Sequence, residues 1–204
     1  DDKLIINNGT LLNTNSGDAI QLQADTVKVN GGEVGSKAVS VNATNNMQLN
    51  GGLVHADEVR LASAQGTITQ QYDNAAAVNG GLVYAGDLYI TSNKAPGAAL
   101  TVDLGSKYNH LSNIFITDGA QGNIAVGSGN DAEGSLNISV INGEGGTGQL
   151  TGSLTVHNYV AGAANKLVVN DNLQAIGDIE LINDEANIEI GANGAAAYLK
   201  AANI

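Results

Sequence analysis

The segment AAVNGGLVYAGDLYI, Ala76–Ile90, holds two short runs of alternating apolar residues, one on each side of Asn79-Gly80-Gly81. Taken alone, this pattern is typical of two strands joined by a tight turn, which is a β-hairpin. The alternative is that the chain turns a corner there and continues in a new direction. The rest of the sequence decides between the two, and the choice fixes the fold class.

Three further segments share this pattern and align with it without a gap. In each one an apolar residue precedes an Asn, and a pair of β-favouring apolar residues begins nine positions after that Asn. The segments are VKVNGGEVGSKAVSV at 27–41, MQLNGGLVHADEVRL at 47–61 and LVVNDNLQAIGDIEL at 167–181. Looser copies begin at Ile6 and Ile141. A meander of hairpins gives no reason for the same turn to recur at this spacing, so the repeats favour a chain that winds onward.

The spacing of the repeats predicts how successive turns stack. Asn30 and Asn50 lie 20 residues apart, which matches one turn of a parallel β-solenoid built from short strands. Val29, Leu49 and Val78 are then expected to lie above one another in an inward column. The Asn side chains beside them are expected to form a ladder, with each amide bonded to the next turn.

The predicted fold class is therefore all-β, a parallel β-solenoid (β-helix) of roughly ten coils of about 20 residues. A single domain is expected over residues 1–204. Its regular repeats occupy 1–92 and 165–190, and an irregular, Gly-rich middle occupies 93–164.

Three local features follow from this interpretation. The interval between copies lengthens to 29 residues before Asn79, which predicts an inserted excursion within Ala62–Ala75. The Ala-rich tail, Ala195–Ala202, is expected to form a short helical turn. Val78→Asp is expected to be strongly destabilising, because it would place an unpaired charge between stacked layers.

Composition excludes several classes of function. The formal net charge is −12 with only eight Lys and Arg residues, so nucleic-acid binding, which needs clustered basic residues, is not expected. An acidic surface also argues against docking on anionic lipid. No run approaches the roughly 18 apolar residues of a spanning helix. Cysteine is absent, which removes disulfides, thiolate metal sites and cysteine nucleophiles.

GGLVHADEVRL (51–61) and GGLVYAGDLYI (80–90) resemble the G-x-[IV]-x-A-G-x-L-x-L repeats of filamentous haemagglutinin-type bacterial surface adhesins, and IGDIEL (176–181) is similar. These repeats occur in two-partner-secreted and autotransporter passengers. The resemblance covers four 15-residue units, under a third of the chain. It implies a right-handed parallel β-helix, secreted or on the cell surface, used for adhesion, fibre building or spacing. It implies no catalytic residue, because the repeat is a scaffold motif.

The residues give little support for catalysis. A polysaccharide lyase of this shape needs a basic residue over a carboxylate-and-calcium cluster, and Arg60 is expected to point to solvent from a strand. A glycosidase needs two carboxylates that face each other, but Asp57, Glu58 and Asp87 fall at the same repeat phase, where turn chemistry accounts for them. The tyrosines that could stack on a sugar are Tyr72, Tyr84, Tyr89 and Tyr108.

No metal site is predicted either. His55, His110 and His157 are isolated and lack metal-ligand spacing, so each is expected at the surface or in a turn. VGSGNDAEG (126–134) partly matches the calcium-binding nonapeptide, which works in tandem and here stands alone. The acidic stretch 171–189 is expected to be a solvated face, with weak divalent-cation binding as the alternative.

The sequence therefore predicts a non-enzymatic, extracellular structural or adhesive β-solenoid, either a self-assembling filament subunit or a segment of a larger surface adhesin. A carbohydrate-binding or carbohydrate-cleaving β-helix protein is the alternative. No catalytic, cofactor-binding or metal-binding residue is predicted, and no cofactor. The expected partners are other copies, met at the solenoid ends, or ligands on host cells or matrix, with neither nucleic acid nor membrane insertion. The expected location is outside a bacterial cell or on its surface.

Overall fold

The computed structural model describes residues 2–15, 17–76, 78–94, 97, 99–117, 119–129, 134–141, 149–191 and 197–204, with Val78 and Asn79 described by their backbone alone. All the secondary structure of these residues is β, and none of it is helix, so no helix among them is long and apolar enough to cross a membrane. The strands are β1 (Lys3–Ile6), β2 (Gly9–Leu12), β3 (Ala19–Ala24), β4 (Thr26–Gly35), β5 (Ala38–Ala43), β6 (Met47–Ser63), β7 (Ile68–Gln70), β8 (Tyr72–Asp73), β9 (Val78–Asn79), β10 (Gly81–Ser92), β11 (Leu100–Leu104), β12 (His110–Thr117), β13 (Asn123–Ser128), β14 (Leu136–Ile141), β15 (Gln149–Leu150), β16 (Leu154–Asn158), β17 (Leu167–Val169), β18 (Leu173–Ala175), β19 (Ile179–Asn183), β20 (Ile188–Ile190) and β21 (Leu199–Lys200).

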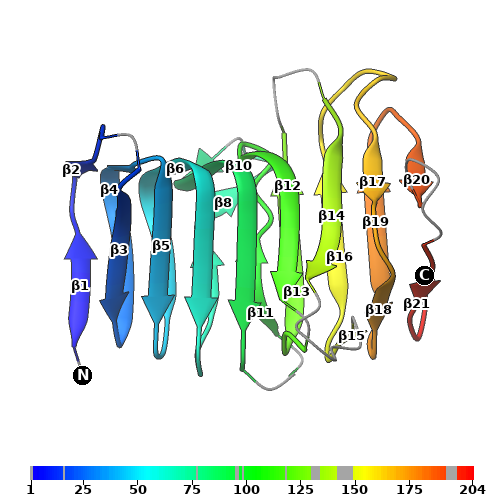
Figure 1. Ribbon diagram of the computed structural model, residues 1–204, viewed down its shortest axis with the longest axis horizontal. Helices are drawn as coiled ribbons and strands as arrows, with labels where there is room; N and C mark the ends of the chain where they lie inside the picture. Colours follow the sequence, from blue (N-terminus) through cyan, green and yellow to red (C-terminus); the bar gives the residue numbers. More distant parts are fainter. Residues whose placement is uncertain are drawn as a thin grey trace.

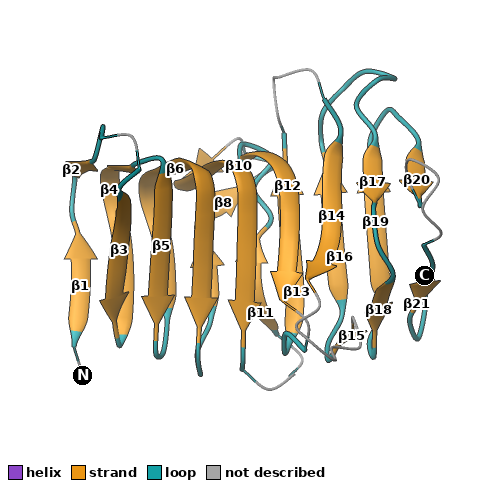
Figure 2. Cartoon of the chain, viewed as in Figure 1, coloured by secondary structure: helices purple, strands orange, loops and turns teal. Residues whose placement is uncertain are grey.

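The chain winds in successive turns along the long axis of the molecule, from the N-terminus at one end to the C-terminus at the other (Figure 1). Most strands pair in parallel with the equivalent strand of the next turn, and together they form one large sheet (Figure 2). Parallel pairing across turns requires the chain to travel around the rod between paired strands, which a hairpin meander cannot do. The all-β, parallel, solenoid-like fold expected from the repeats is therefore present.

The first face of the rod is a stack of inward aliphatic side chains. Among the described residues it is formed by β1, β4, β6, β7, β11, β13, β16 and β19. One column runs through all eight strands, and its members are Leu4, Val27, Met47, Ile68, Val102, Ile124, Leu154 and Ile179. From Val27 to Ile179 these side chains are at most 2% exposed. Layers about 4.8 Å apart allow each aliphatic side chain to pack directly on the next.

The second face lies opposite in the turn and repeats the arrangement. It is formed by β3, β5, the last part of β6, and β10, β12, β14, β17 and β20. Its central inward column consists of Ile20, Val39, Val59, Leu88, Ile114, Ile138, Val169 and Ile190. The core is thus a narrow seam of Val, Ile and Leu between two faces, which agrees with the shortage of aromatic residues.

A third side of the turn changes position along the rod. In the N-terminal half it connects the end of the first face to the start of the second, and it consists of β2 and the middle parts of β4, β6 and β10. In the C-terminal half it connects the end of the second face back to the first, as the short parallel sheet β15-β18-β21. The cross-sections of the two ends of the rod therefore differ.

Eight strands stack on each main face of the described chain, so the expectation of roughly ten turns is not confirmed. Turns are longer than 20 residues wherever the chain leaves the faces. Equivalent residues of β6 and β10, for example Gly52 and Gly81, lie 29 positions apart. Residues 93–164, which look irregular in the sequence, contribute β11 to β16.

The predicted excursion before Gly81 exists. It begins within Ala62–Ala75, at β8, but it extends past this window to β9. β7 still stacks on β6, with Leu49 opposite Gln70. The chain then forms a small antiparallel hairpin, β8-β9, and returns where the amide of Gly81 donates to the carbonyl of Gln71. Next to Leu49, the column therefore continues through Gln70, and the prediction that Val78 occupies this place is wrong. The side chains of Val78 and Asn79 lie outside the description.

The Asn ladder is confirmed for three turns. Asn30 Nδ2 donates to Asn7 Oδ1 at 2.8 Å, and Asn50 Nδ2 donates to Asn30 Oδ1 at 2.9 Å. The looser first copy at Ile6 also stacks as expected, since Ile6 lies opposite Val29. These bonds hold the corner that follows the first face in the N-terminal turns.

The fourth copy, 167–181, stacks half a turn out of phase with the other three. Val169 joins the second face opposite Ile138, and Ile179 joins the first face opposite Leu154. The gap-free alignment predicts the reverse, with Val169 on the first face and Ile179 on the second. An apolar run followed by a turn residue marks the end of a strand on either face, which is why the motif could not identify the face.

The tail also differs from its expected helical turn. Within Ala195–Ala202, Leu199 and Lys200 form β21, which pairs in parallel with β18, while residues 192–196 lie outside the described chain. β21 extends the short sheet by one layer, so stacking on β18 outweighs the helix preference of alanine.

Gly52 has a conformation and an environment that no other residue type satisfies. Its φ is +79°, and an added Cβ would lie 2.4 Å from the carbonyl oxygen of Gly32 in the preceding turn. Gly52→Ala is expected to lower the free energy of unfolding by roughly 3 kcal/mol, from backbone strain and the displaced layer together. Gly119 has a similar φ of +72° with nothing within 4 Å, so Gly119→Ala should cost only about 1 kcal/mol. Urea unfolding of both variants checks this, and equal losses would contradict the steric part.

Candidate functional site

The three histidines lie on the outside of the rod, with His55 and His110 in one outer column on either side of Tyr84 and His157 nearer the C-terminal end. His55 Nε2 lies 2.8 Å from Glu33 Oε1, and the His157 ring contacts Asp184 Oδ1 at 2.6 Å. His110 stacks on Tyr84 with ring centroids 4.0 Å apart. Among the described residues, no three His, Asp or Glu side chains gather as metal ligands.

Aromatic side chains on the second face stack along the rod instead of facing solvent. The rings of Tyr89 and Phe115 lie opposite in register, with centroids 4.8 Å apart and planes 19° apart. The guanidinium of Arg60 covers the other side of Tyr89 at 3.9 Å from the ring centroid. Sugar binding uses an exposed ring face, and stacking plus the cation–π contact already occupy both faces of Tyr89.

Arg60 and the three candidate carboxylates do not form a catalytic constellation. Arg60 is exposed, as expected, and its Nε donates to Glu58 Oε1 at 2.6 Å. Glu58 and Asp87 lie opposite each other in neighbouring turns. Asp87 Oδ1 accepts a hydrogen bond from Asn113 Nδ2 at 2.7 Å. Glu58 and Asp87 are thus neighbours in one outer column, and together with Asp57 they line a hollow of about 380 Å³.

The acidic stretch 171–189 runs once around the rod between β17 and β20, and several of its carboxylates have protein partners. Asp184 contacts His157, Glu189 forms an ion pair with Lys166, and Glu185 accepts the amide of Gly162. Asp178 accepts from the side chain of Asn203. The second candidate for metal binding, the loop 126–134, includes residues 130–133, which lie outside the described chain, while Val126–Ser128 belong to β13.

A buried amide pair, which the repeats did not predict, ends the third side in the middle of the rod. Asn109 is fully buried, and its Oδ1 accepts from the Val83 amide at 3.0 Å and from Gln70 Nε2 at 2.6 Å. Its Nδ2 donates to Gln70 Oε1 and to the carbonyls of Leu104 and Gly127. The Asn109 side chain thereby provides hydrogen-bond partners at the corner where the third side ends, after β10. It occupies the place where an aliphatic column would otherwise continue.

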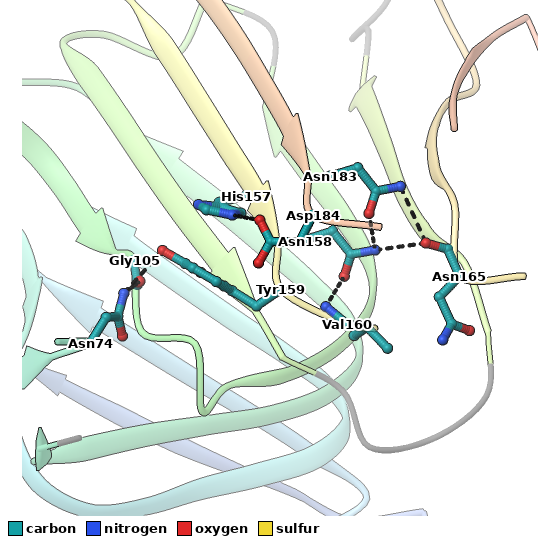
Figure 3. A network of polar contacts seen from close by, with 9 residues as sticks. All are labelled: Asn74, Gly105, His157, Asn158, Tyr159, Val160, Asn165, Asn183 and Asp184. Carbon is teal, nitrogen blue, oxygen red and sulfur yellow. Dashed lines mark hydrogen bonds and ion pairs between the residues drawn. The ribbon is translucent and has the colours of Figure 1, made fainter. Parts of the chain in front are cut away.

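A second polar network follows the same corner toward the C-terminus (Figure 3). Asn158 is 1% exposed, and its Nδ2 donates to Asn183 Oδ1 and to the carbonyl of Asn165. Asn183 Nδ2 donates to the same carbonyl. Outside this group, the Tyr159 ring stacks on His157 at 3.6 Å, and Asn74 Nδ2 donates to Tyr159 Oη at 3.0 Å. These bonds provide hydrogen-bond partners for the polar groups at this corner.

Tyr72 connects the β8-β9 hairpin to the first face. Its hydroxyl donates to Asp103 Oδ1 at 2.6 Å. Burial and this hydrogen bond raise the pKa of Tyr72 above its ordinary value. Because the folded pKa is higher than the unfolded one, the contribution to stability is complete below about pH 10 and is lost as pH rises further.

Tyr72→Phe is therefore expected to flatten the alkaline loss of stability. Urea unfolding between about pH 8 and pH 11 should show the two proteins differing most below about pH 10 and converging above it, where the unfolded tyrosine ionises. A constant difference across this range would show that Tyr72 does not titrate as its environment requires.

At each end of the rod, the described strands have a partner strand on one side only. At the C-terminal end, β19, β20 and β21 each pair with one strand only. A hollow of about 650 Å³ lies between β19 and β20, and its apolar lining includes Leu181, Ile190 and Ile204. At the N-terminal end, β1, β2 and β3 likewise have one partner strand each. Open strand edges of this kind accept further strands.

No family model, no curated protein and no solved structure matches the chain. The functional argument therefore rests on the sequence and on the arrangement of the described side chains.

Proposed function

We propose that the chain is a parallel β-solenoid that acts as a non-enzymatic structural or adhesive element outside a bacterial cell or on its surface. The observation that carries this proposal is the continuity of side-chain columns along the rod. Inside, aliphatic residues pack through eight strands of each face, and outside, Asn, Arg and aromatic side chains bond to the turn before or after them. Such a stack resists bending because every turn is hydrogen-bonded to its neighbours.

Its net charge supports the same role. The formal net charge of −12 over 204 residues keeps a β-rich rod soluble, because like-charged flanks repel one another. The resemblance of the two GGLV segments to haemagglutinin-type repeats gives independent support for a surface adhesin. In this proposal the chain associates through its ends, as a filament subunit or as a segment of a larger surface structure, or with ligands on host cells or matrix.

The alternative is a carbohydrate-binding or carbohydrate-cleaving protein. Against it stand the stacked rings of Tyr84 and Tyr89, whose faces are turned toward His110 and Phe115. Against cleavage stands the in-row arrangement of Glu58 and Asp87. The tyrosines thus lack the free ring face that sugar binding uses, and the two acids lack the facing arrangement that cleavage needs.

The test combines microscopy with an activity screen on the purified chain. Negative-stain images are expected to show straight, uniform rods or end-to-end arrays of rods. Incubation with a polysaccharide panel is expected to release neither reducing ends nor unsaturated sugars. Globular particles would contradict the structural role, and release of either product would establish the enzymatic alternative.

A further inference from the structure

The β8-β9 hairpin reaches a turn of the rod that does not stack on its own turn. The hairpin leaves the rod directly after β7, the fourth strand of the first face. Asn74, in this hairpin, donates from Nδ2 to Tyr159 Oη at 3.0 Å (Figure 3). Tyr159 follows β16, the seventh strand of that face, and is 85 positions further along the chain. In a solenoid each turn contacts the turns beside it, so this bond is an exception.

The hairpin is also bonded to the fifth turn, which lies between these two. The Tyr72 hydroxyl donates to Asp103 Oδ1 at 2.6 Å, and Asn74 Nδ2 donates to the Gly105 carbonyl at 2.8 Å. Asn74 Oδ1 accepts from the Lys107 amide at 2.9 Å, and the Asn74 carbonyl accepts from Lys107 Nζ at 2.7 Å. Asn74 therefore holds the fifth and the seventh turn at once.

The corner of the rod leaves room for the hairpin. A Cβ added at Gly105 would lie 2.3 Å from Tyr72 Oη, so the hairpin lies against a position that has no side chain. In the sixth turn the corner again presents a glycine, Gly127, which lies opposite His157 of the seventh. The hairpin thus lies along a flat part of the corner.

Both partners in the long-range bond are held in place by other contacts. Asp73 Oδ1 accepts from the amides of Ala75 and Ala76 at 2.9 and 3.0 Å, which fixes the turn around Asn74. The Tyr159 ring stacks on His157 at 3.6 Å. Because neither group has to be ordered when the bond forms, the bond loses little of its free energy to conformational entropy.

The hairpin covers the part of the rod where the third side changes corner. The N-terminal third side ends at β10, and the C-terminal one begins at β15, in the seventh turn. Among the described residues, the fifth and sixth turns consist of two faces only, β11 with β12 and β13 with β14. These turns have fewer strand pairs to bond them to their neighbours, so they are the place where the rod separates most easily.

We propose that the β8-β9 hairpin is a strap that couples the two halves of the rod across this junction. It makes the turns before β10 and the turns after β15 open together, where contacts between neighbouring turns alone would let each half open separately. This inference rests on the proposed structural role, since it explains how a load-bearing rod keeps its turns together where its cross-section changes.

Two variants release the strap in steps. Tyr159→Phe keeps the ring that stacks on His157 and removes only the hydroxyl that Asn74 reaches. Asn74→Ala removes the side-chain bonds to both the fifth and the seventh turn. Tyr108→Phe is the control for the first, because the described residues offer its hydroxyl no hydrogen-bond partner. Asn42→Ala, at an exposed amide bonded to Ser40 of its own strand, is the control for the second.

Native-state hydrogen exchange of the whole chain, followed by mass spectrometry, tests the coupling. In the parent protein, peptides from β4 and β6 are expected to show the same opening free energy as peptides from β16 and β19. Asn74→Ala is expected to separate the exchange rates of the two halves by about tenfold, and Tyr159→Phe by about threefold, as one lost hydrogen bond predicts. Both controls should leave the two halves equal.

Urea unfolding of the same proteins gives a second measurement. The parent is expected to unfold in a single transition, and Asn74→Ala with a lower m-value or in two transitions, because its halves no longer unfold together.

The inference is overturned if the halves of the parent already exchange at different rates. It is equally overturned if Asn74→Ala speeds exchange in both halves alike, or if Tyr108→Phe separates them as much as Tyr159→Phe does. Each of these results leaves the structural role standing, because that role is tested separately by microscopy and the polysaccharide panel.

Discussion

Leu49→Asp is expected to leave the chain largely unfolded. Leu49 is 1% exposed and packs between Val29 and Gln70 in the second inward column of the first face. The substitution removes roughly 2–3 kcal/mol of apolar burial and adds an unpaired carboxylate in a dry seam, at a further cost of several kcal/mol. Their sum reaches the whole stability of a typical domain, about 5–15 kcal/mol.

The neighbouring residue provides the control for this experiment. Gln48 belongs to the same strand and points outward, opposite Lys28 and Thr69. Gln48→Asp introduces the same charge and should change stability by less than about 0.5 kcal/mol. Leu49→Ala keeps the effect measurable, with an expected loss of about 2–5 kcal/mol. Far-UV circular dichroism with urea unfolding reports all three, and a stable Leu49→Asp protein would show that the column does not face inward.

Asn109→Asp is expected to lower the free energy of unfolding by about 4 kcal/mol, although it preserves the shape of the side chain. The amide nitrogen that it removes donates to three oxygens, those of Gln70, Leu104 and Gly127, at 2.9 to 3.2 Å. A carboxylate oxygen in its place would face those oxygens without a donor and without access to water. The loss should decrease at low pH, where the introduced acid is neutral.

Asn113→Ala is the matched comparison. The Asn113 amide donates to Asp87 and accepts from Asn137 on the outer surface of β12. Because water can replace these bonds, the expected loss is about 1 kcal/mol or less. Thermal and urea unfolding of both variants decide the point. Similar losses would mean that the Gln70–Asn109 pair is no more important than an ordinary surface amide ladder.

The sequence was sufficient for the overall fold because the physical cause of the fold is itself periodic. Val27 and Met47 stack because each turn must return an aliphatic residue to the same place, and a repeat of 20 residues records this return. The ladder of Asn7, Asn30 and Asn50 follows from the same register. These predictions are confirmed because they depend on the spacing of neighbouring copies alone.

The errors have a common physical origin in the turns that leave the faces. Asn79 shares its motif with Asn50, yet its backbone belongs to the β8-β9 hairpin, because ten residues after Gln70 form an excursion before the stack resumes at Gly81. The copy at Leu167 is out of phase because the third side has moved to the other corner by that point. A local motif identifies a corner without saying which corner it is.

The polar interior could not be predicted from the repeats, for a different reason. Gln70 and Asn109 are 39 residues apart in the sequence and belong to no repeated pattern. Their bond exists only because the hairpin ends one side of the turn and leaves backbone groups to satisfy. Only the three-dimensional register reveals this pair.

The central claim, a stiff rod of parallel layers, is tested most directly by a distance between two spin labels. The chain has no cysteine, so Lys28→Cys and Thr155→Cys provide the only attachment points. These residues lie in one outer column, five steps apart through Gln48, Thr69, Asp103 and Ala125. At about 4.8 Å a step, pulsed electron paramagnetic resonance should give a single narrow distribution centred near about 24 Å. A broad distribution, or one centred well away from this value, would contradict the account.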